Sequence, residues 1–205
     1  MMNAERESLS TRISRRYAAR AWPAWVGVVV LTLMTVGYAH AAVPRSVRAA
    51  HLYTQLGHAK WIALGHGPKI LYDVFDPNCP YCHLLFNELK PLIGPDHLTV
   101  REVPVGYLTT TSSAKAAAIL MAKDPRQMLL RGETHFSFQH GMQIPLTIPS
   151  RAVRQVLHRT LQSVVAAAGY AIVPILAYKT KDGQAKFVIG QPGPQTLKTL
   201  IKSIR

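Results

Sequence analysis

The chain has 205 residues, enough for one domain with its own core and too few for two full domains. Its formal net charge is +14, but the basic residues are scattered. They form neither a Lys/Arg block nor the basic and aromatic pattern that binds nucleic acid, so we expect no nucleic-acid partner. The two cysteines lie two residues apart, and such a short loop cannot stabilise a fold as a structural disulfide.

Residues 1–41 have the features of an export signal. An uncharged run over residues 21–42 follows Arg12, Arg15, Arg16 and Arg20, and an A-x-A cleavage pattern ends at Ala41. The run of 22 residues is also long enough to span a bilayer, so an inner-membrane anchor is the alternative. Either reading predicts that the remainder is exported, to a place where thiols can be oxidised and stay oxidised.

The predicted elements begin with a lead-in helix or linker over residues 42–68, where apolar residues recur near the helical period. The run "KILYDVF" over residues 69–75 is apolar and rich in branched and aromatic residues, which predicts a buried central strand. After a turn, Pro80 suits the first turn of a helix that we expect to end near Gly94. Residues 98–105 alternate like a second strand.

The second half of the chain is predicted to be helical at first and then to return to strands. Residues 132–149 contain glycine, two prolines and two histidines, and we expect them to form a flexible region or lid. A Lys-Asp-Gly turn at residues 181–183 predicts a β-hairpin. The predicted helices are residues 112–123, 125–131, 151–168 and 195–204, and the hairpin strands are "AIVPILAYKT" and "QAKFVIG".

The cysteines form the motif Cys79-Pro80-Tyr81-Cys82, which has two chemical interpretations. It is a C-x-x-C redox motif, and with His83 it also spells the C-x-x-C-H attachment site of a c-type haem. A haem needs axial ligands and a mostly helical pocket, whereas this motif follows a strand. A zinc site needs four ligands, and no second pair stands at a usual spacing. We therefore favour a dithiol and expect no metal or cofactor.

The position of the motif assigns different roles to the two cysteines. A helix N-terminus stabilises a thiolate, so Cys79 is expected to be the exposed sulfur of low pKa that attacks. Cys82, one turn inside the helix, is expected to be more buried and to resolve the mixed disulfide.

Three separated segments resemble the bacterial periplasmic disulfide isomerases DsbC and DsbG, and are nearer to DsbG: "FDPNCPYCHLLF", "AKAAAILMAKDP" and "GYAIVPILAY". The resemblance implies an α/β, thioredoxin-like fold over residues 69–205. A helical insertion, about residues 111–168, would separate the second strand from a cis-proline strand. It also implies a thiol:disulfide oxidoreductase without metal or haem, whose partners are cysteine-containing envelope proteins and a membrane redox protein that resets the dithiol.

The same resemblance implies a set of site residues. Cys79 and Cys82 would be the catalytic pair, and Val173-Pro174 would form a cis bond whose backbone faces an extended substrate, together with Pro80 and Tyr81. Asp73 lies six residues before Cys79, where thioredoxin has a buried aspartate. We expect Asp73 to be buried, to have a raised pKa and to shuttle a proton for Cys82. The alternative is that Asp73 faces solvent.

Three departures from the DsbC and DsbG pattern matter, and the first is Asp73, where those isomerases carry an apolar residue. Val173 stands where those isomerases carry Thr, as in the oxidase DsbA. Residues 42–68 are too short for the isomerases' dimerisation domain, so we expect a monomer, or at most a weak dimer, that is a poor isomerase. The counter-reading is that Leu52, Leu56 and Ile62 pair two chains. A thioredoxin-like binding or chaperone module without catalysis is the alternative function, and the redox direction stays open.

Overall fold

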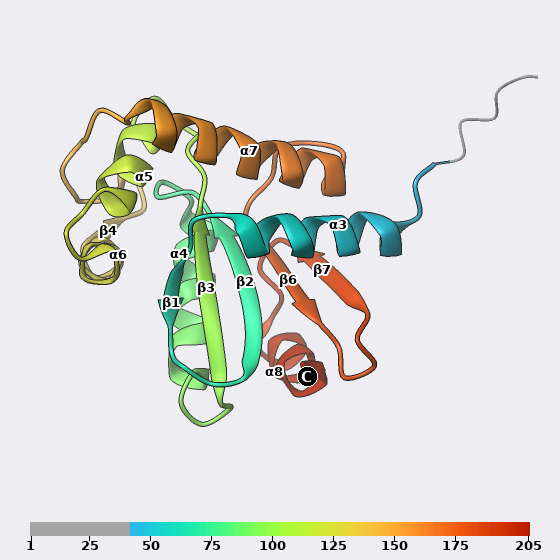
Figure 1. Ribbon diagram of the computed structural model, residues 1–205. Helices are drawn as coiled ribbons and strands as arrows, with labels where there is room; N and C mark the ends of the chain where they lie inside the picture. Colours follow the sequence, from blue (N-terminus) through green and yellow to red (C-terminus); the bar gives the residue numbers. More distant parts are fainter. Residues whose placement is uncertain (1–41) are drawn as a thin grey trace, which may run out of the picture. The chain divides into compact units, whose positions relative to one another are not determined.

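A five-stranded mixed sheet organises the computed structural model, which describes residues 42–205. The predicted export segment, residues 1–41, lies outside the described residues. The central strand β2 pairs in parallel with β3, and the other neighbours pair antiparallel, in the order β1-β3-β2-β6-β7. Figure 1 shows this order from β1 to β7. The strands are β1 (Ile62–Leu64), β2 (Lys69–Phe75), β3 (Leu98–Pro104), β6 (Ile175–Lys179) and β7 (Ala185–Ile189).

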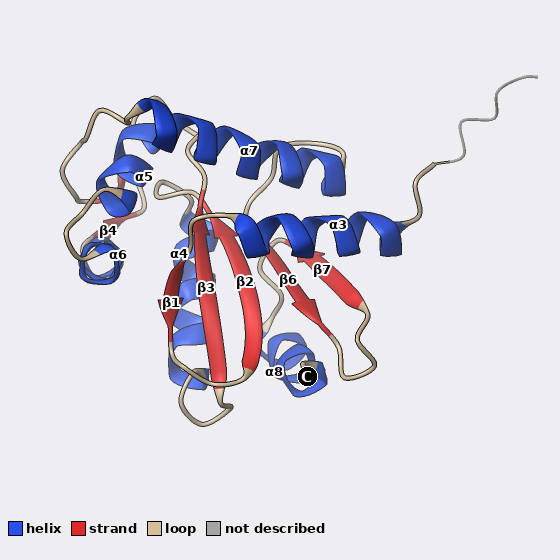
Figure 2. Ribbon diagram, in the orientation of Figure 1, coloured by secondary structure: helices blue, strands red, loops and turns tan. Residues whose placement is uncertain are grey.

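Helices cover both faces of the sheet (Figure 2). Helices α4 (Pro80–Leu89) and α8 (Pro194–Ser203) pack against one face, and α3 (Arg45–His58) and α7 (Arg151–Ala168) against the other. Between β3 and β6 the chain adds α5 (Ser112–Leu120), α6 (Pro125–Thr134), β4 (Phe136–Ser137), β5 (Gly141–Met142) and α7. A short 3-10 turn, η1 (Lys90–Leu92), follows α4. In this described part, no helix combines the length and apolar character needed to cross a bilayer.

The segment 42–68 differs from the predicted lead-in or linker, because it supplies part of the sheet and part of the core. Strand β1 pairs antiparallel with β3, with Ile62 opposite Glu102. Helix α3 packs on α7 and the sheet, and its Leu52 and Leu56 are 0% exposed. The prediction missed β1 because three residues are too short to show an alternating pattern.

The proposed lid, residues 132–149, is instead held against the body of the domain. Helix α6 continues to Thr134, and β4 and β5 form a small hairpin. The N–H of Met142 donates to the carbonyl of Pro77 at 2.9 Å, and the Met142 side chain is buried in the core. Gly141, at φ 69°, lies so close to Asn78 that an added Cβ would be 2.1 Å from its Oδ1.

Local signals at the ends of α7 confirm the predicted helix. Ser150 is its N-cap and accepts a hydrogen bond from the N–H of Val153 at 3.3 Å. Gly169 ends the helix at φ 92°, a left-handed conformation that favours glycine. Gly183, at φ 83°, sits in the turn that joins β6 and β7, so the predicted hairpin is confirmed as well.

Candidate active site

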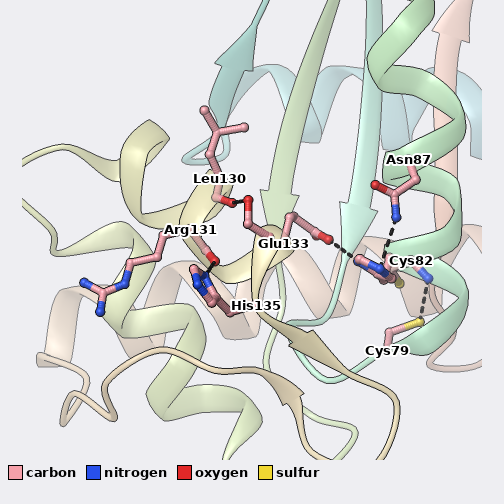
Figure 3. A network of polar contacts seen from close by, with 9 residues as sticks. Cys79, Cys82, Asn87, Leu130, Arg131, Glu133 and His135 are labelled. Carbon is pink, nitrogen blue, oxygen red and sulfur yellow. Dashed lines mark hydrogen bonds and ion pairs between the residues drawn. The ribbon is translucent and has the colours of Figure 1, made fainter.

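Helix α4 begins at the first cysteine of the C-x-x-C motif. Cys79 is the N-cap in extended conformation, and Pro80 occupies the first helical position, where its missing N–H leaves no bond unmade. Cys79 Sγ accepts a hydrogen bond from the N–H of Cys82 at 3.2 Å, a contact drawn in Figure 3. The sulfur therefore takes the place of a capping oxygen at the positive end of the helix dipole.

The two cysteines are equally inaccessible, which corrects the expectation that Cys79 is exposed. Both are free thiols and each is 3% exposed. Their chemistry still diverges. The pKa of Cys79 is lowered chiefly by the hydrogen bond from the Cys82 thiol, although burial opposes the shift. The pKa of Cys82 is raised well above its usual value, first by burial and then by its interaction with Cys79.

The bond between Val173 and Pro174 is cis, and it lies beside the dithiol as the resemblance implies. The carbonyl oxygen of Val173 is 4.0 Å from Cys79 Sγ. On the dithiol's other flank, Tyr81 is 63% exposed and Pro80 is half-buried. The structure thus brings together Cys79, Cys82 and the cis-proline loop, with Tyr81 at the surface.

The carboxylate of Asp76 ties the turn before Cys79 to the loop that follows β3. Its Oδ1 accepts hydrogen bonds from the N–H of Asn78 (3.0 Å) and the hydroxyl of Ser112 (2.7 Å). Its Oδ2 accepts from the N–H groups of Tyr107 (2.8 Å) and Leu108 (3.1 Å). The sequence predicts a turn at Asp76 but does not show that its carboxylate accepts these hydrogen bonds, because a turn pattern does not indicate which distant donors come close to it.

Asp73 is buried beneath α4, which excludes the alternative that it faces solvent. The alternation of β2 places Asp73 on the same face as Leu71 and Phe75, toward α4. It is 1% exposed, and neither carboxylate oxygen has a hydrogen-bond partner among the described residues. Burial is the main cause that raises the pKa of Asp73 well above its usual value, and the charges of Glu133 and Cys79 add to it.

A second carboxyl, Glu102, lies next to Asp73 in the sheet. The parallel register of β2 and β3 pairs the two residues, and Glu102 is also buried. Burial, followed by the charges of Asp73 and Glu133, raises the pKa of Glu102 well above its usual value. A charged residue in an otherwise apolar strand was the signal that selected Asp73. The same signal in "LTVREVPV" would have selected Glu102, which sequence reasoning missed.

A histidine–glutamate pair links α4 to the helical insertion. His83 Nδ1 and Glu133 Oε2 lie 2.5 Å apart, and Asn87 Nδ2 lies 3.0 Å from His83 Nε2 (Figure 3). The imidazole also stacks on Phe136, with ring centroids 4.2 Å apart. Burial raises the pKa of Glu133, and the bond to His83 opposes this. Sequence reasoning considered His83 only as a haem ligand and missed Glu133, which carries no signal in a polar helix.

With both ring nitrogens of His83 engaged, neither is free to serve as an axial ligand. In the part of the chain that the structure describes, no group of three or more His, Cys, Asp or Glu side chains is arranged to hold a metal ion.

Comparisons with known proteins agree with this geometry. DsbG of Pseudomonas aeruginosa, a thiol:disulfide interchange protein, is 29% identical over 158 residues, covering 75% of this chain and 59% of the relative. DsbG of Escherichia coli is 24% identical over 154 residues, covering 73% and 60%. The solved catalytic domain of Proteus mirabilis ScsC superposes with a TM-score of 0.62 at 16% identity, covering 77% of this chain and 96% of that domain.

The chain is similar in sequence to DsbG and has a thioredoxin-like fold. The match spans only about three fifths of the two DsbG relatives. No family profile matches the chain. The predicted fold class, including the helical insertion before the cis-proline strand, is confirmed for this DsbG-like chain.

The contrast between the two thiols generates a first prediction. Iodoacetamide, applied to the reduced protein at about pH 6, should label Cys79 before Cys82, because the thiolate is the nucleophile. In Cys82→Ala the pKa of Cys79 should rise, since its main stabilising donor is lost. Ultraviolet titration of the thiolate measures this shift, and Cys82→Ser, which keeps a hydroxyl donor, should show a smaller one. Preferential labelling of Cys82 would contradict the assignment.

The buried carboxyls generate a second prediction, about stability and pH. The folded-state pKa values of Asp73 and Glu102 are raised, so the folded protein keeps protons that the unfolded chain releases. Their contribution to stability is therefore fully present below about pH 4, the usual pKa of these groups in an unfolded chain. It is lost as the pH rises through their pKa values in the folded protein. Asp73→Asn and Glu102→Gln should each flatten the fall in unfolding free energy toward neutral pH, measured by denaturant titration.

Asp182, whose pKa shifts in the opposite direction to that of Asp73, provides the control. The pKa of Asp182 is lowered, chiefly by its hydrogen bond with the Thr180 hydroxyl. Asp182 therefore stabilises the folded protein when the pH is above the pKa that Asp182 has in the unfolded chain. Asp182→Asn should lower stability at neutral pH relative to acid pH. If Asp73→Asn and Asp182→Asn shifted the pH profile in the same direction, the assignment of Asp73 would be wrong.

Proposed function

We propose that the chain is an exported thiol:disulfide oxidoreductase that exchanges disulfides with cysteine-containing proteins of the cell envelope. The observation that supports this most directly is Cys79 itself. Its sulfur caps α4, has a lowered pKa and lies 4.0 Å from the carbonyl of the cis-proline loop. A purely structural N-cap needs no second thiol to stabilise its charge. Relatives named thiol:disulfide interchange proteins support the same reaction class.

The exchange proceeds in two steps that conserve electrons. In the reducing direction, the Cys79 thiolate attacks one sulfur of a client disulfide, forming a Cys79–client disulfide and releasing the other client sulfur as a thiolate. Cys82 then loses its proton and attacks Cys79, which releases the reduced client and leaves a Cys79–Cys82 disulfide. The oxidising direction is the reverse. We propose that a membrane redox partner resets the pair.

Asp73 is the proposed acceptor for the Cys82 proton. Its charge is one of the causes that raise the pKa of Cys82, so the two groups interact electrostatically. The carboxylate oxygens have no competing partner among the described residues, and the raised pKa brings Asp73 closer to the working pH. The negative charge of Glu133 helps to raise the pKa of Asp73 and so keeps it able to accept a proton.

The client is proposed to lie in extended form along the cis-proline loop. The backbone of Val173 and Pro174 would present hydrogen-bonding groups, and Tyr81 and Pro80 would supply apolar contact beside Cys79. The hydrophobic Val173 side chain replaces the hydroxyl expected from the isomerases, which removes one polar contact to the client.

The site is proposed to act in the periplasm, after export directed by residues 1–41, with a membrane anchor as the alternative. In an oxidising compartment the thiols of the site and of its clients can be oxidised and stay oxidised. A binding module without catalysis has no use for a thiolate stabilised in this way, and the haem reading loses its axial ligand because His83 is engaged by Glu133 and Asn87.

Activity with a model client tests the proposed reaction. The protein should accelerate insulin reduction by dithiothreitol, and Cys79→Ala should abolish the acceleration. Cys82→Ala should accumulate mixed disulfides with envelope proteins, visible on non-reducing gels, because the resolving thiol is missing. Asp73→Asn should change the pH dependence of exchange. Wild-type protein without any acceleration, together with no trapped species, would favour the binding module.

The domain is proposed to work as a monomer. The apolar stripe of α3 that could have paired two chains is used internally, since Leu52 and Leu56 are buried against α7 and the sheet. Leu52→Ala should therefore lower the unfolding free energy by about 2–5 kcal/mol, with a midpoint that does not depend on protein concentration. The exposed Val47→Ala is the control. Light scattering that shows a stable dimer, with strong refolding of scrambled ribonuclease, would contradict the proposal.

A further inference from the structure

A polar pocket of about 710 Å³ adjoins the dithiol turn and has no role in the chemistry described so far. It lies between the loop after β3, the N-terminal half of α5 and the segment that contains β5. Asn78, the residue before Cys79, forms part of its wall, so the pocket begins within one residue of the nucleophile. A client whose cysteine reacts with Cys79 would therefore place neighbouring residues within reach of this pocket.

The lining of the pocket is basic and contains no carboxylate. Three basic side chains, Lys115, Arg131 and His140, contribute to it, with three threonines and several amides. Figure 3 shows Arg131 extending from α6 on the side opposite Glu133, away from the histidine–glutamate pair. No hydrogen bond or ion pair of the Arg131 guanidinium is found among the described residues.

Lys115 is a built feature of the pocket and not a loose surface side chain. It is 6% exposed, and its ammonium group donates to Asn78 Oδ1 at 2.7 Å and to the carbonyl of His140. An ammonium has three donors, so one remains for a ligand. Burial lowers the pKa of Lys115, and the charge of Asp76 opposes this. Asp76 itself cannot occupy the pocket, because its two oxygens already accept four hydrogen bonds.

The distribution of charge outside the pocket favours the same ligand. The chain beyond residue 41 has 19 basic and 8 acidic side chains. Four of the acidic ones, Asp73, Asp76, Glu102 and Glu133, are buried. Within residues 42–205 no lysine or arginine forms an ion pair with a carboxylate. The surface that a client meets is therefore more basic than the sequence suggests, which attracts acidic segments and repels basic ones.

We infer that this pocket binds carboxylate side chains of the client polypeptide next to its reactive cysteine. Lys115 supplies a fixed donor near the turn, Arg131 supplies a second cation at the rim, and the threonine hydroxyls and amides supply further donors. The pocket thus selects clients with Asp or Glu close to the cysteine. This inference rests on the proposed exchange reaction, and it names the class of client that the site prefers.

Matched cysteine peptides test the preference. Three peptides differ only in the two residues that precede the cysteine, which are both Glu, both Gln or both Lys. In a second series the two varied residues follow the cysteine. Each peptide reduces the oxidised protein, and each rate is divided by the peptide's rate with hydroxyethyl disulfide, which corrects for the thiol's own pKa. The Glu peptide should react about three- to fivefold faster than the Gln peptide in at least one series, and added salt should erase the difference.

Variants locate the effect. Arg131→Gln should reduce the Glu/Gln rate ratio, and Arg131→Glu should favour the Lys peptide. Lys198→Gln, an exposed site on α8 with the same charge change, is the matched control and should leave the ratio unchanged. A wild-type ratio at or below one in both series, or a ratio that responds equally to Lys198→Gln and Arg131→Gln, would overturn the inference.

A binding measurement separates this inference from the proposed reaction. The same peptides with serine in place of cysteine, carrying a fluorescent label, report binding by anisotropy without any exchange. If the Glu peptide binds more tightly than the other two, and its binding is weaker in Arg131→Gln, the carboxylate-binding pocket is supported even if no disulfide exchange is observed. Equal binding of the three peptides would overturn it even if exchange proceeds.

Discussion

The turn that presents the dithiol depends on one buried carboxylate, Asp76. Its oxygens accept hydrogen bonds from three backbone N–H groups and one hydroxyl, which come from both the turn and the loop after β3. A carboxylate taken out of water is stable only when its lone pairs are satisfied in this way. Asp76 thus works together with the side chain of Asn78, which also hydrogen-bonds Ser112 and Lys115, to hold the turn before Cys79 against α5.

Asp73 and Glu102 are in the opposite situation to Asp76. They are buried side by side, and both oxygens of Asp73 and Oε1 of Glu102 have no hydrogen-bond partner among the described residues, so their environment favours the neutral, protonated form. Asp76, in the turn after β2, therefore has its lone pairs satisfied, whereas Asp73 and Glu102, within the sheet, are placed to hold protons. Both arrangements cost stability that the surrounding apolar core must offset, which is the pattern expected where chemistry, and not packing, has selected the residue.

The helical insertion contributes directly to the site, although it lies far from the cysteines in sequence. Glu133 on α6 reaches His83 on α4, and Phe136 in β4 stacks on the same imidazole. On its other side, α6 carries Arg131 into the basic pocket. The insertion thus joins two functions: it stabilises the first turns of the dithiol helix, and it shapes the surface beside Cys79 that a client would meet.

The sequence by itself determined the elements whose signals are local. The C-x-x-C motif after an apolar strand, the caps of α7 and the hairpin turn at Gly183 are properties of a few neighbouring residues, and the three family-like segments fixed the order of the fold. Only the tertiary structure decided that β1 joins the sheet, that Cys79 is as buried as Cys82, and that Asp73, Glu102 and Glu133 gather under α4. Burial and proton affinity depend on side chains brought together from distant parts of the chain, and no local pattern records which ones they are.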